Sequence, residues 1–406
     1  AIALALSIDP AEVRRRNLLR ENDATATSQV LKESVAAVDT MEAAIKKSHY
    51  QDKVDQYSKH NSTCARYKKG IGVSTVFYGV GLGAGGKHLA RSGAFMQLHT
   101  DGSLEVAVGH TEMGQGFKTV VAQMASTATG VPYDQIKILE IDTSRVPDSG
   151  PTVASRATFM SGNALLEAAG ELKKRLIPVL GMKFPGTEPE SLSWENGYVF
   201  PRSTPDQKVP LPDIARSACY GMQINLSVVG WYVAPPTSFD QDTGQGDAYF
   251  TYTYASNIAE VTVDTRTGVV NLDRLTACLD VGKAVNPQQV EGQIQGGALQ
   301  GIGYALTEKI VHDSAGLMKT TGFSTYIIPT AMDAPPIDVV VLEKPHSRGP
   351  FGAKGFGELP LMGVAPAIAS AVHNATGVAF RELPLIPELV LEKLEIQSAS
   401  GDKHDQ

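Results

Sequence analysis

The stretch GPFGAKGFGELP, residues 349–360, places one carboxylate, Glu358, among four glycines and directly ahead of Leu359 and Pro360. Because glycine has no Cβ, such a loop can bring its backbone close to a bulky group. A single acid presented there is suited to act as a base beside a large cofactor. The alternative is a glycine-rich surface turn with an exposed glutamate. The choice between these two interpretations depends on the rest of the chain.

A second glycine-rich segment, GHTEMGQG at residues 109–116, is followed at once by FKTVVAQMASTATG, which has the pattern of a helix. Glycines on both sides of Gln115 at a helix start would let a phosphate or a pterin approach the main chain. The Gln115 amide can pair with the polar edge of a ring. A glycine C-cap and a turn before an unrelated helix is the alternative.

A hydroxyl-rich segment, PTVASRATFMSGNA at residues 151–164, precedes another predicted helix. Its hydroxyls can cap that helix or donate to a pyrophosphate, although Ser/Thr-rich loops cap helices in many proteins. Arg156 is its single charge and can serve either an anion or a surface carboxylate.

The segment NPQQVEGQIQGGALQGIG, residues 286–303, places Gln293 in a helix of small and apolar residues. A buried amide there needs a defined partner. Gln288, Gln289 and Gln295 crowd the same region, and tight helix packing without a ligand is the alternative.

These four segments resemble the cofactor loops of molybdenum hydroxylases, the family of xanthine dehydrogenase and aldehyde oxidoreductase, and the resemblance in spacing covers about residues 9–391. It implies that Glu358 is the catalytic base. It also implies a set of residues in contact with a molybdenum–molybdopterin cofactor: Met113, Gly114, Gln115, Gly116, Ala154, Ser155, Gln293, Lys354 and Gly357. From its place before Glu358, Lys354 can stabilise a nearby carboxylate or oxyanion or extend into solvent. The family holds its metal through the pterin dithiolene, so no direct metal ligand is expected from the protein.

The resemblance further implies the C-terminal half of a divided molybdopterin-binding subunit. The family's arginine-bearing substrate loop belongs upstream of the segment AIALALSIDPAEV with which this chain begins, and that segment already has the pattern of an apolar helix. The implied partners are the N-terminal half of the molybdenum subunit, an iron–sulfur subunit and an FAD subunit, because Cys64, Cys219 and Cys278 lack cluster spacing. The cytosine dinucleotide form of the cofactor is expected.

The implied activity is hydroxylation of a small purine- or nicotinate-like N-heterocycle with water as the oxygen source. An aldehyde oxidoreductase, which converts an aldehyde to a carboxylic acid, is the competing enzyme. A non-catalytic scaffold subunit of such a complex is the alternative from another class, and an intact Glu358 and GQG segment argue against it.

The composition limits the other classes of function. A net charge of -7, with only short basic runs such as residues 14–16 and 68–69, argues against a nucleic-acid or anionic-membrane partner. No apolar run approaches about 18 residues and no signal peptide is found, so neither a membrane span nor export is expected. Three dispersed cysteines make a reducing cytoplasm the default location.

Strand and helix patterns alternate along 406 residues, which predicts an α+β fold of mixed sheets with helices packed on them. We expect a helical lead-in at residues 1–69, a molybdopterin-binding subdomain at 70–230 and a second subdomain with the glutamate loop at 231–406. Hairpin turns are predicted at TDGS (100–103) and TRTG (265–268). Four helices are predicted after glycine- or hydroxyl-rich segments, so that their N-termini would present free N–H groups to an anion: residues 117–129, 162–180, 287–309 and 364–376.

Overall fold

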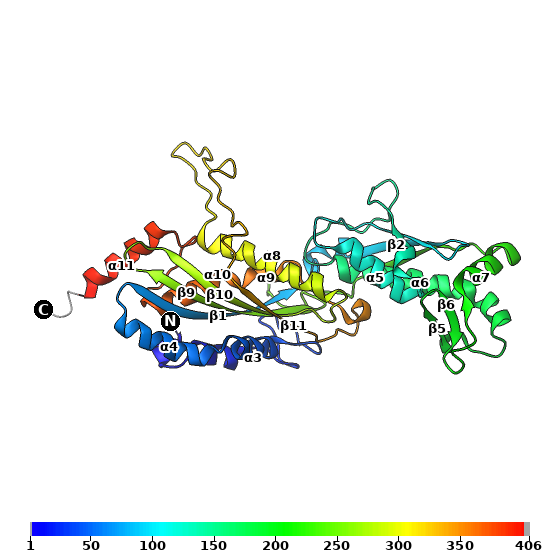
Figure 1. Ribbon diagram of the computed structural model, residues 1–406, viewed down its shortest axis with the longest axis horizontal. Helices are drawn as coiled ribbons and strands as arrows, with labels where there is room; N and C mark the ends of the chain where they lie inside the picture. The colour runs from blue at the N-terminus through cyan, green and yellow to red at the C-terminus, as the bar shows by residue number, and fades with distance from the viewer. Residues whose placement is uncertain (1, 402–406) are drawn as a thin grey trace.

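The computed structural model describes residues 2–401, and their helices and strands form two lobes along one long axis (Figure 1). The first lobe is built on a four-stranded sheet with the order β1 (Tyr67–Gly79), β9 (Tyr252–Asp264), β10 (Val270–Asp280) and β11 (Ile337–Leu342). β1, β9 and β10 are antiparallel neighbours, whereas β10 and β11 run parallel. A mixed sheet carrying helices confirms the predicted α+β class.

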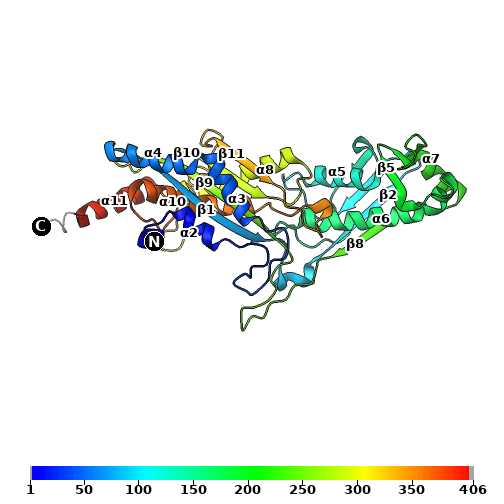
Figure 2. The ribbon, with the colours of Figure 1, turned by 90° about the horizontal axis from the view of Figure 1, so that it is seen from below.

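Helices cover both faces of this sheet: α3 (Ala37–Ser48) and α4 (Tyr50–Thr63) on one, α8 (Pro287–Leu306) and α10 (Val364–Thr376) on the other (Figure 2). Strand β9 is therefore buried along nearly its whole length. Consecutive residues serve opposite faces, because Ile258 packs toward α3 and Ala259 toward α10.

Two glycines of β1 bring α10 into direct contact with the sheet. A Cβ on Gly70 would lie 2.0 Å from the carbonyl oxygen of Ala371, and one on Gly72 would lie 2.3 Å from that of Ala367. The alternation in KKGIGV therefore leaves one face of the strand without side chains, and the helix backbone fills that space.

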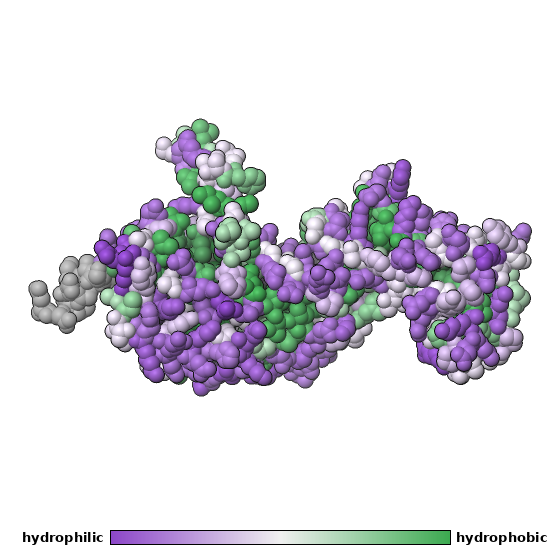
Figure 3. Space-filling view, viewed as in Figure 1, coloured by the Kyte–Doolittle hydropathy of each residue, from purple (hydrophilic) through white to green (hydrophobic). Residues whose placement is uncertain are grey.

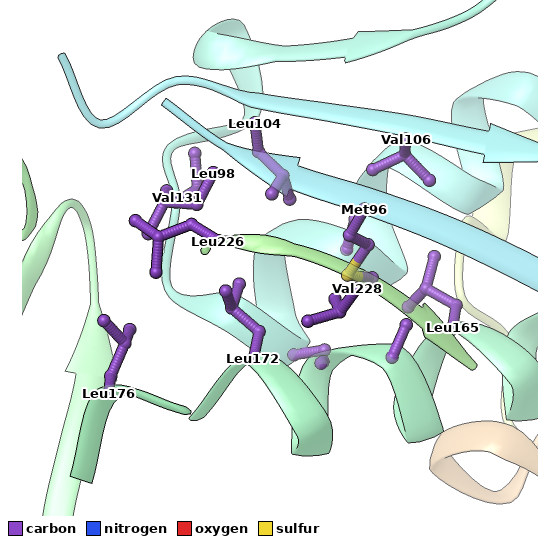
Figure 4. Close-up of a cluster of buried hydrophobic side chains, with 14 of the residues drawn as sticks. Met96, Leu98, Leu104, Val106, Val131, Leu165, Leu172, Leu176, Leu226 and Val228 are labelled. Atoms are coloured by element: carbon purple, nitrogen blue, oxygen red, sulfur yellow. The ribbon is translucent and has the colours of Figure 1, made fainter. Parts of the chain in front are cut away.

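The second lobe is built on a sheet with the order β4 (Ile136–Ile138), β3 (Leu104–Val108), β2 (Arg91–Leu98) and β8 (Ser227–Val233). Helices α5 (Phe117–Thr129) and α6 (Ala157–Lys183) pack on it, and Met96, Leu104, Leu165 and Val228 meet in its core (Figure 4). The hairpin between β2 and β3 turns at the predicted residues 100–103. The end of the second lobe far from the first carries a small sheet and a short helix: β5 (Leu192–Glu195), β6 (Tyr198–Pro201), β7 (Val209–Pro210) and α7 (Leu211–Arg216).

The remaining helices and helical turns lie at the chain ends and in the connections: α1 (Ile2–Leu6), α2 (Pro10–Asn17), α9 (Leu359–Met362), α11 (Pro387–Gly401), η1 (Ala84–Leu89), η2 (Tyr133–Gln135), η3 (Pro189–Ser191), η4 (Ser217–Gly221) and η5 (Pro350–Gly352). Asp9 caps α2, its Oδ1 accepting from the backbone N–H of Ala11 at 2.7 Å. None of the helices within residues 2–401 is both long and apolar enough to cross a membrane.

The connection between α8 and β11, residues 307–336, projects from the first lobe as an arm (Figure 1). It exposes large apolar side chains, among them Phe323 and Met332, and apolar colour is visible along it in Figure 3.

The chain enters the second lobe after β1 and returns after β8. Strand β1 is hydrogen-bonded to β9, so residues 67–79 share a sheet with residues 252–264. The predicted boundaries at 69/70 and 230/231 assign these two strands to different units and remain predictions.

Candidate functional site

A cavity of about 490 Å³ lies where the two lobes meet, a size usual for a small-molecule or cofactor site. The second lobe contributes residues 113–120 and 152–158 to its wall, and the first contributes residues 281–300 and 353–358. The four segments that the sequence singled out therefore converge on one cavity.

Most of the predicted site residues line this cavity: Met113, Gly114, Gln115, Ser155, Gln293, Lys354, Gly357 and Glu358. Gly116 and Ala154 lie behind the wall. Gly116 is the N-cap of α5 with a φ of 79°, and the Ala154 carbonyl accepts a hydrogen bond from the Gly81 N–H at 2.9 Å.

Glu358 ends the glycine-rich loop and is the N-cap residue of α9, with its side chain exposed at the cavity. Its Oε2 accepts hydrogen bonds from the Tyr78 hydroxyl and, at 2.9 Å, from Ser155 Oγ. Ser155 Oγ in turn accepts from the Glu358 N–H at 3.1 Å. Within residues 2–401 we find no hydrogen bond to Oε1, so this oxygen is free to receive a proton.

The glycines of this loop bring two protein segments together. A Cβ on Gly355 would lie 1.5 Å from the carbonyl oxygen of Ser155, so only glycine fits there. At Gly357 the nearest atom to an added Cβ is Ser155 Oγ at 3.8 Å, which leaves its backbone open to the cavity. The sequence predicted that the backbone of this loop lies close to a cofactor. At Gly355 it lies instead against the hydroxyl-rich segment, at Ser155.

Lys354 reaches the cavity wall, but its ammonium points into the protein. The ammonium forms an ion pair with Asp280, and neither side chain has any exposed surface. Nζ also donates to the carbonyls of Ser34 at 3.1 Å and Tyr252 at 2.9 Å. Burial raises the pKa of the Asp280 carboxyl and lowers the pKa of the Lys354 ammonium, and their mutual attraction opposes both shifts. The structure therefore places this charge where it anchors the loop, neither in solvent nor beside Glu358.

The Gln115 amide is bound to its own loop. Its Oε1 accepts from the Met113 N–H at 2.6 Å, and its Nε2 donates to the Thr111 carbonyl at 2.8 Å. The side chain lines the cavity in a fixed orientation, and each amide atom keeps one further hydrogen-bonding position for a ring edge.

Glu112 occupies the N-terminus of α5. Its Oε1 accepts from the N–H groups of Gly114 at 2.8 Å and Gly116 at 3.0 Å, and its Oε2 accepts from that of Lys118 at 3.0 Å. Although burial raises the pKa of Glu112, these backbone hydrogen bonds hold it below its usual value. The prediction that this helix presents free N–H groups to an anion is wrong for the N–H of Lys118, because the Glu112 carboxylate already holds it.

Gln289 is the site residue that sequence reasoning passed over in favour of Gln293. It lines the cavity at the start of α8, where Asn286 Oδ1 caps its backbone N–H at 3.0 Å. Its side-chain Oε1 is buried without a hydrogen-bond partner in the described part of the chain, and a Cβ on Gly116 would lie 2.7 Å from that oxygen. Since a buried unpaired carbonyl oxygen is costly, a ligand that donates a hydrogen bond fits here. Its place in the first turn after a capping asparagine is the signal that could have distinguished it.

Arg156 serves neither of its predicted partners. It is 1% exposed, and its guanidinium donates to four backbone carbonyls at 2.8–2.9 Å: those of Ser149, Pro151, Leu89 and Arg91. These bonds hold the loop in which Ala154 and Ser155 adopt left-handed backbone with φ of 56° and 52°. Consecutive non-glycine residues in this region are strained and are typical of functional loops.

Direct metal ligation is not a feature of the described residues: no group of three or more His, Cys, Asp or Glu side chains in residues 2–401 could hold a metal ion. The polar groups of the cavity include amides, hydroxyls, bare backbone and the Glu358 carboxylate, beside apolar side chains such as Val290 and Phe356.

Comparison with known proteins covers three of these four segments with a family model, and the glutamate loop at 349–360 lies beyond it. Residues 43–335 match the model of a family described as the molybdopterin cofactor-binding domain. Over 93% of its length the chain is 30% identical to the xanthine dehydrogenase/oxidase of Mus musculus, of which it covers 26%. It is 29% identical to the xanthine dehydrogenase molybdenum-binding subunit of Escherichia coli O157:H7, over 97% of this chain and 50% of that protein.

A solved structure shows the same likeness in three dimensions. The aldehyde oxidoreductase of Desulfovibrio gigas superposes with a TM-score of 0.80 and 31% identity, over 97% of this chain and 39% of that one. The chain thus spans half or less of the length of these relatives.

Proposed function

The chain belongs to the molybdopterin cofactor-binding domain family, and from this premise we propose that it is the cofactor-binding, base-bearing part of a molybdenum hydroxylase. The convergence of Glu358 and three cofactor-type segments on one cavity of about 490 Å³ carries the proposal. We further propose that the N-terminal half of the molybdenum subunit, an iron–sulfur subunit and an FAD subunit complete the enzyme.

The residues present fit a molybdopterin. The unpaired Gln289 Oε1 would accept from a pterin N–H, and nothing lies within 4 Å of a Cβ added to Gly114, so the backbone there is open. Ser155, Gln293 and Gly357 line the same wall. When bound, the molybdenum cofactor supplies the redox chemistry, with water as the source of oxygen.

The task of the chain itself is to accept a proton. Glu358 presents Oε1 to the cavity while Tyr78 and Ser155 hold Oε2. A carboxylate fixed in this way is a general base for a group activated within hydrogen-bond reach. The buried Lys354–Asp280 pair keeps the loop in place without lending its charge to the cavity.

For the substrate we propose a purine- or nicotinate-like N-heterocycle. The 30% identity to a xanthine dehydrogenase over 93% of this chain supports it. An aldehyde is the second candidate, because the 31% identity to an aldehyde oxidoreductase is equally close. Values of kcat/KM for purines, nicotinate and aldehydes, measured on the purified complex, decide between them.

The nucleotide form of the cofactor and the cellular location of the enzyme are proposed from the family resemblance. We propose the cytosine dinucleotide form, which mass spectrometry of the nucleotide released from the complex would identify, and a cytoplasmic enzyme. Glu112 already holds the N–H of Lys118 in α5 and Asn286 that of Gln289 in α8, so a second phosphate would have to bind other groups on the wall.

The base assignment is tested by Glu358→Gln in the assembled complex. We expect turnover to fall about 100- to 10,000-fold, the range for loss of a general base, with molybdenum content unchanged. Glu140→Gln, a change at a surface carboxylate with 88% of its side chain exposed, is the matched control. Full turnover by Glu358→Gln would end the assignment. If the unmodified native complex contained no molybdenum, that result would favour the scaffold alternative.

A further inference from the structure

Tyr78 lies directly behind the proposed base although 280 positions separate the two residues in sequence. It is the penultimate residue of β1, where it pairs with Thr253 of β9, so the sheet fixes its backbone. Its ring packs against an apolar cluster that includes Leu359, the residue following Glu358. Tyr78 is not among the residues that line the cavity, so it reaches the site only through the carboxylate.

The two hydroxyls around Glu358 act on the same oxygen. Tyr78 OH and Ser155 Oγ both donate to Oε2. Two donors on one oxygen fix the rotation of the carboxylate and leave Oε1 as the oxygen that faces the cavity. Burial, followed by the hydrogen bond to Glu358, raises the pKa of the Tyr78 phenol, so it remains a protonated donor in the neutral range.

We propose that Tyr78 is a positioning residue for the Glu358 base: its phenol holds Oε2, directs Oε1 at the reacting group and favours the ionised carboxylate. This inference rests on the proposed function. Its physical basis is that hydrogen bonds donated to a carboxylate stabilise the charged form. Removing one donor should therefore make Glu358 harder to ionise and less well oriented.

Other charges around the carboxylate are already engaged. On the glutamate loop, the Lys354 ammonium is paired with Asp280. Before α6, the Arg156 guanidinium is held by backbone carbonyls. After β10, the Lys283 ammonium is paired with Glu343. Beside β1 the phenol of Tyr249 approaches Tyr78 and is the remaining titratable neighbour. None of these cations donates a hydrogen bond to Glu358, which leaves Tyr78 and Ser155 as its donors in the described part of the chain.

The test is Tyr78→Phe in the assembled complex, because this change removes the hydroxyl and keeps the ring. We expect kcat to fall about 10- to 100-fold, as for loss of a hydrogen bond to a charged group, with molybdenum content unchanged. The acidic limb of the pH profile of kcat/KM should move to higher pH by about one unit. Tyr67→Phe, at the other end of β1, is the matched control: its ring lies under the Arg66 guanidinium, an interaction that phenylalanine retains.

A readout without turnover comes from infrared difference spectroscopy of the complex against its Glu358→Gln variant, which reports the protonation of this one carboxyl. Its titration midpoint should rise in Tyr78→Phe and stay unchanged in Tyr67→Phe. A fluorinated tyrosine at position 78 is a stronger donor of unchanged shape, and it should shift the same midpoint and the acidic limb to lower pH.

The outcomes separate the two proposals. If Glu358→Gln is inactive but neither Tyr78→Phe nor the fluorinated residue moves the pH profile or the infrared midpoint, the role of Tyr78 is overturned and the base assignment stands. If Glu358→Gln is active, the proposed function itself fails. A fall in kcat without any shift in the pH profile or the midpoint would likewise contradict the inference, because loose packing alone would produce it.

Discussion

At the scale of single residues, His110 makes the fold sensitive to acid. It is fully buried beside the GQG segment, its Nδ1 is 2.7 Å from Ser161 Oγ, and its Nε2 has no partner among the described residues. Burial first, and then the charge of Arg156, lowers its pKa to about 3. An unfolded histidine has a pKa near 6.5, so the unfolded chain binds the extra proton between these values. Stability is therefore lost as the pH falls through that window.

We expect His110 to cost about 2 kcal/mol of unfolding free energy at pH 5 relative to pH 7.5, from the 1.4 kcal/mol that each pKa unit represents. Urea denaturation at the two pH values measures the loss. His110→Asn retains a group that can hydrogen-bond to Ser161 but does not titrate. The variant should therefore lose about 2 kcal/mol less unfolding free energy between pH 7.5 and pH 5 than the unmodified chain. His88→Asn, at an exposed histidine, should leave the pH dependence as it was. An unchanged pH dependence in His110→Asn would show that this imidazole is not the acid-sensitive group.

At the scale of elements, Glu112 holds the first turn of α5 and the GQG segment together through three backbone N–H groups. Glu112→Ala would leave those donors without a partner in the protein. We expect a loss of about 1–3 kcal/mol of unfolding free energy and a fall in molybdenum content of the complex, because Gln115 is held by the same segment. Glu140→Ala is a matched control, since Glu140 pairs with the ammonium of the same Lys118 at the surface and should contribute at most about 1 kcal/mol. Equal effects of the two changes would contradict the capping role.

Elements that depend on local sequence were predicted from it. Helices at 117–129 and 364–376 have the predicted bounds, because a glycine lies at each end of both helices. Helix α6 begins at Ala157, five residues before the predicted start, since the bonds of Arg156 to distant carbonyls order the preceding loop. These hydrogen bonds join Arg156 to carbonyls 65 and 67 positions away, so no local sequence pattern predicts them.

The site was predictable to the extent that its residues follow turn chemistry. Glycines around Gln115 and Glu358 marked two of the four cavity segments. The partners of Glu358 and Lys354 were not predictable, because Tyr78 and Asp280 lie 280 and 74 positions away and reach them only through the pairing of β1, β9 and β10. Gln293 lines the cavity as expected, and Gln289 of the same helix lines it too. The neighbour that distinguishes Gln289 is Gly116 of the other lobe, which local sequence does not reveal.

At the scale of the whole molecule, the two lobes have separate apolar cores. One cluster draws all its buried members from residues 94–228 and another from residues 259–390. Apolar burial is the main source of cooperativity within a domain, so two separate apolar cores are expected to unfold separately. We therefore expect the cofactor-free chain to unfold in two calorimetric transitions.

Two truncations assign these transitions. Leu165 on α6 and Ile368 on α10 are each fully buried, one in each core. Leu165→Ala should destabilise the second lobe by about 2–5 kcal/mol and lower one transition temperature, while the other stays in place. Ile368→Ala should lower the other transition by a similar amount and leave the first unchanged. A single transition that both variants lower equally would show that the lobes form one cooperative unit, coupled by the contacts around the cavity.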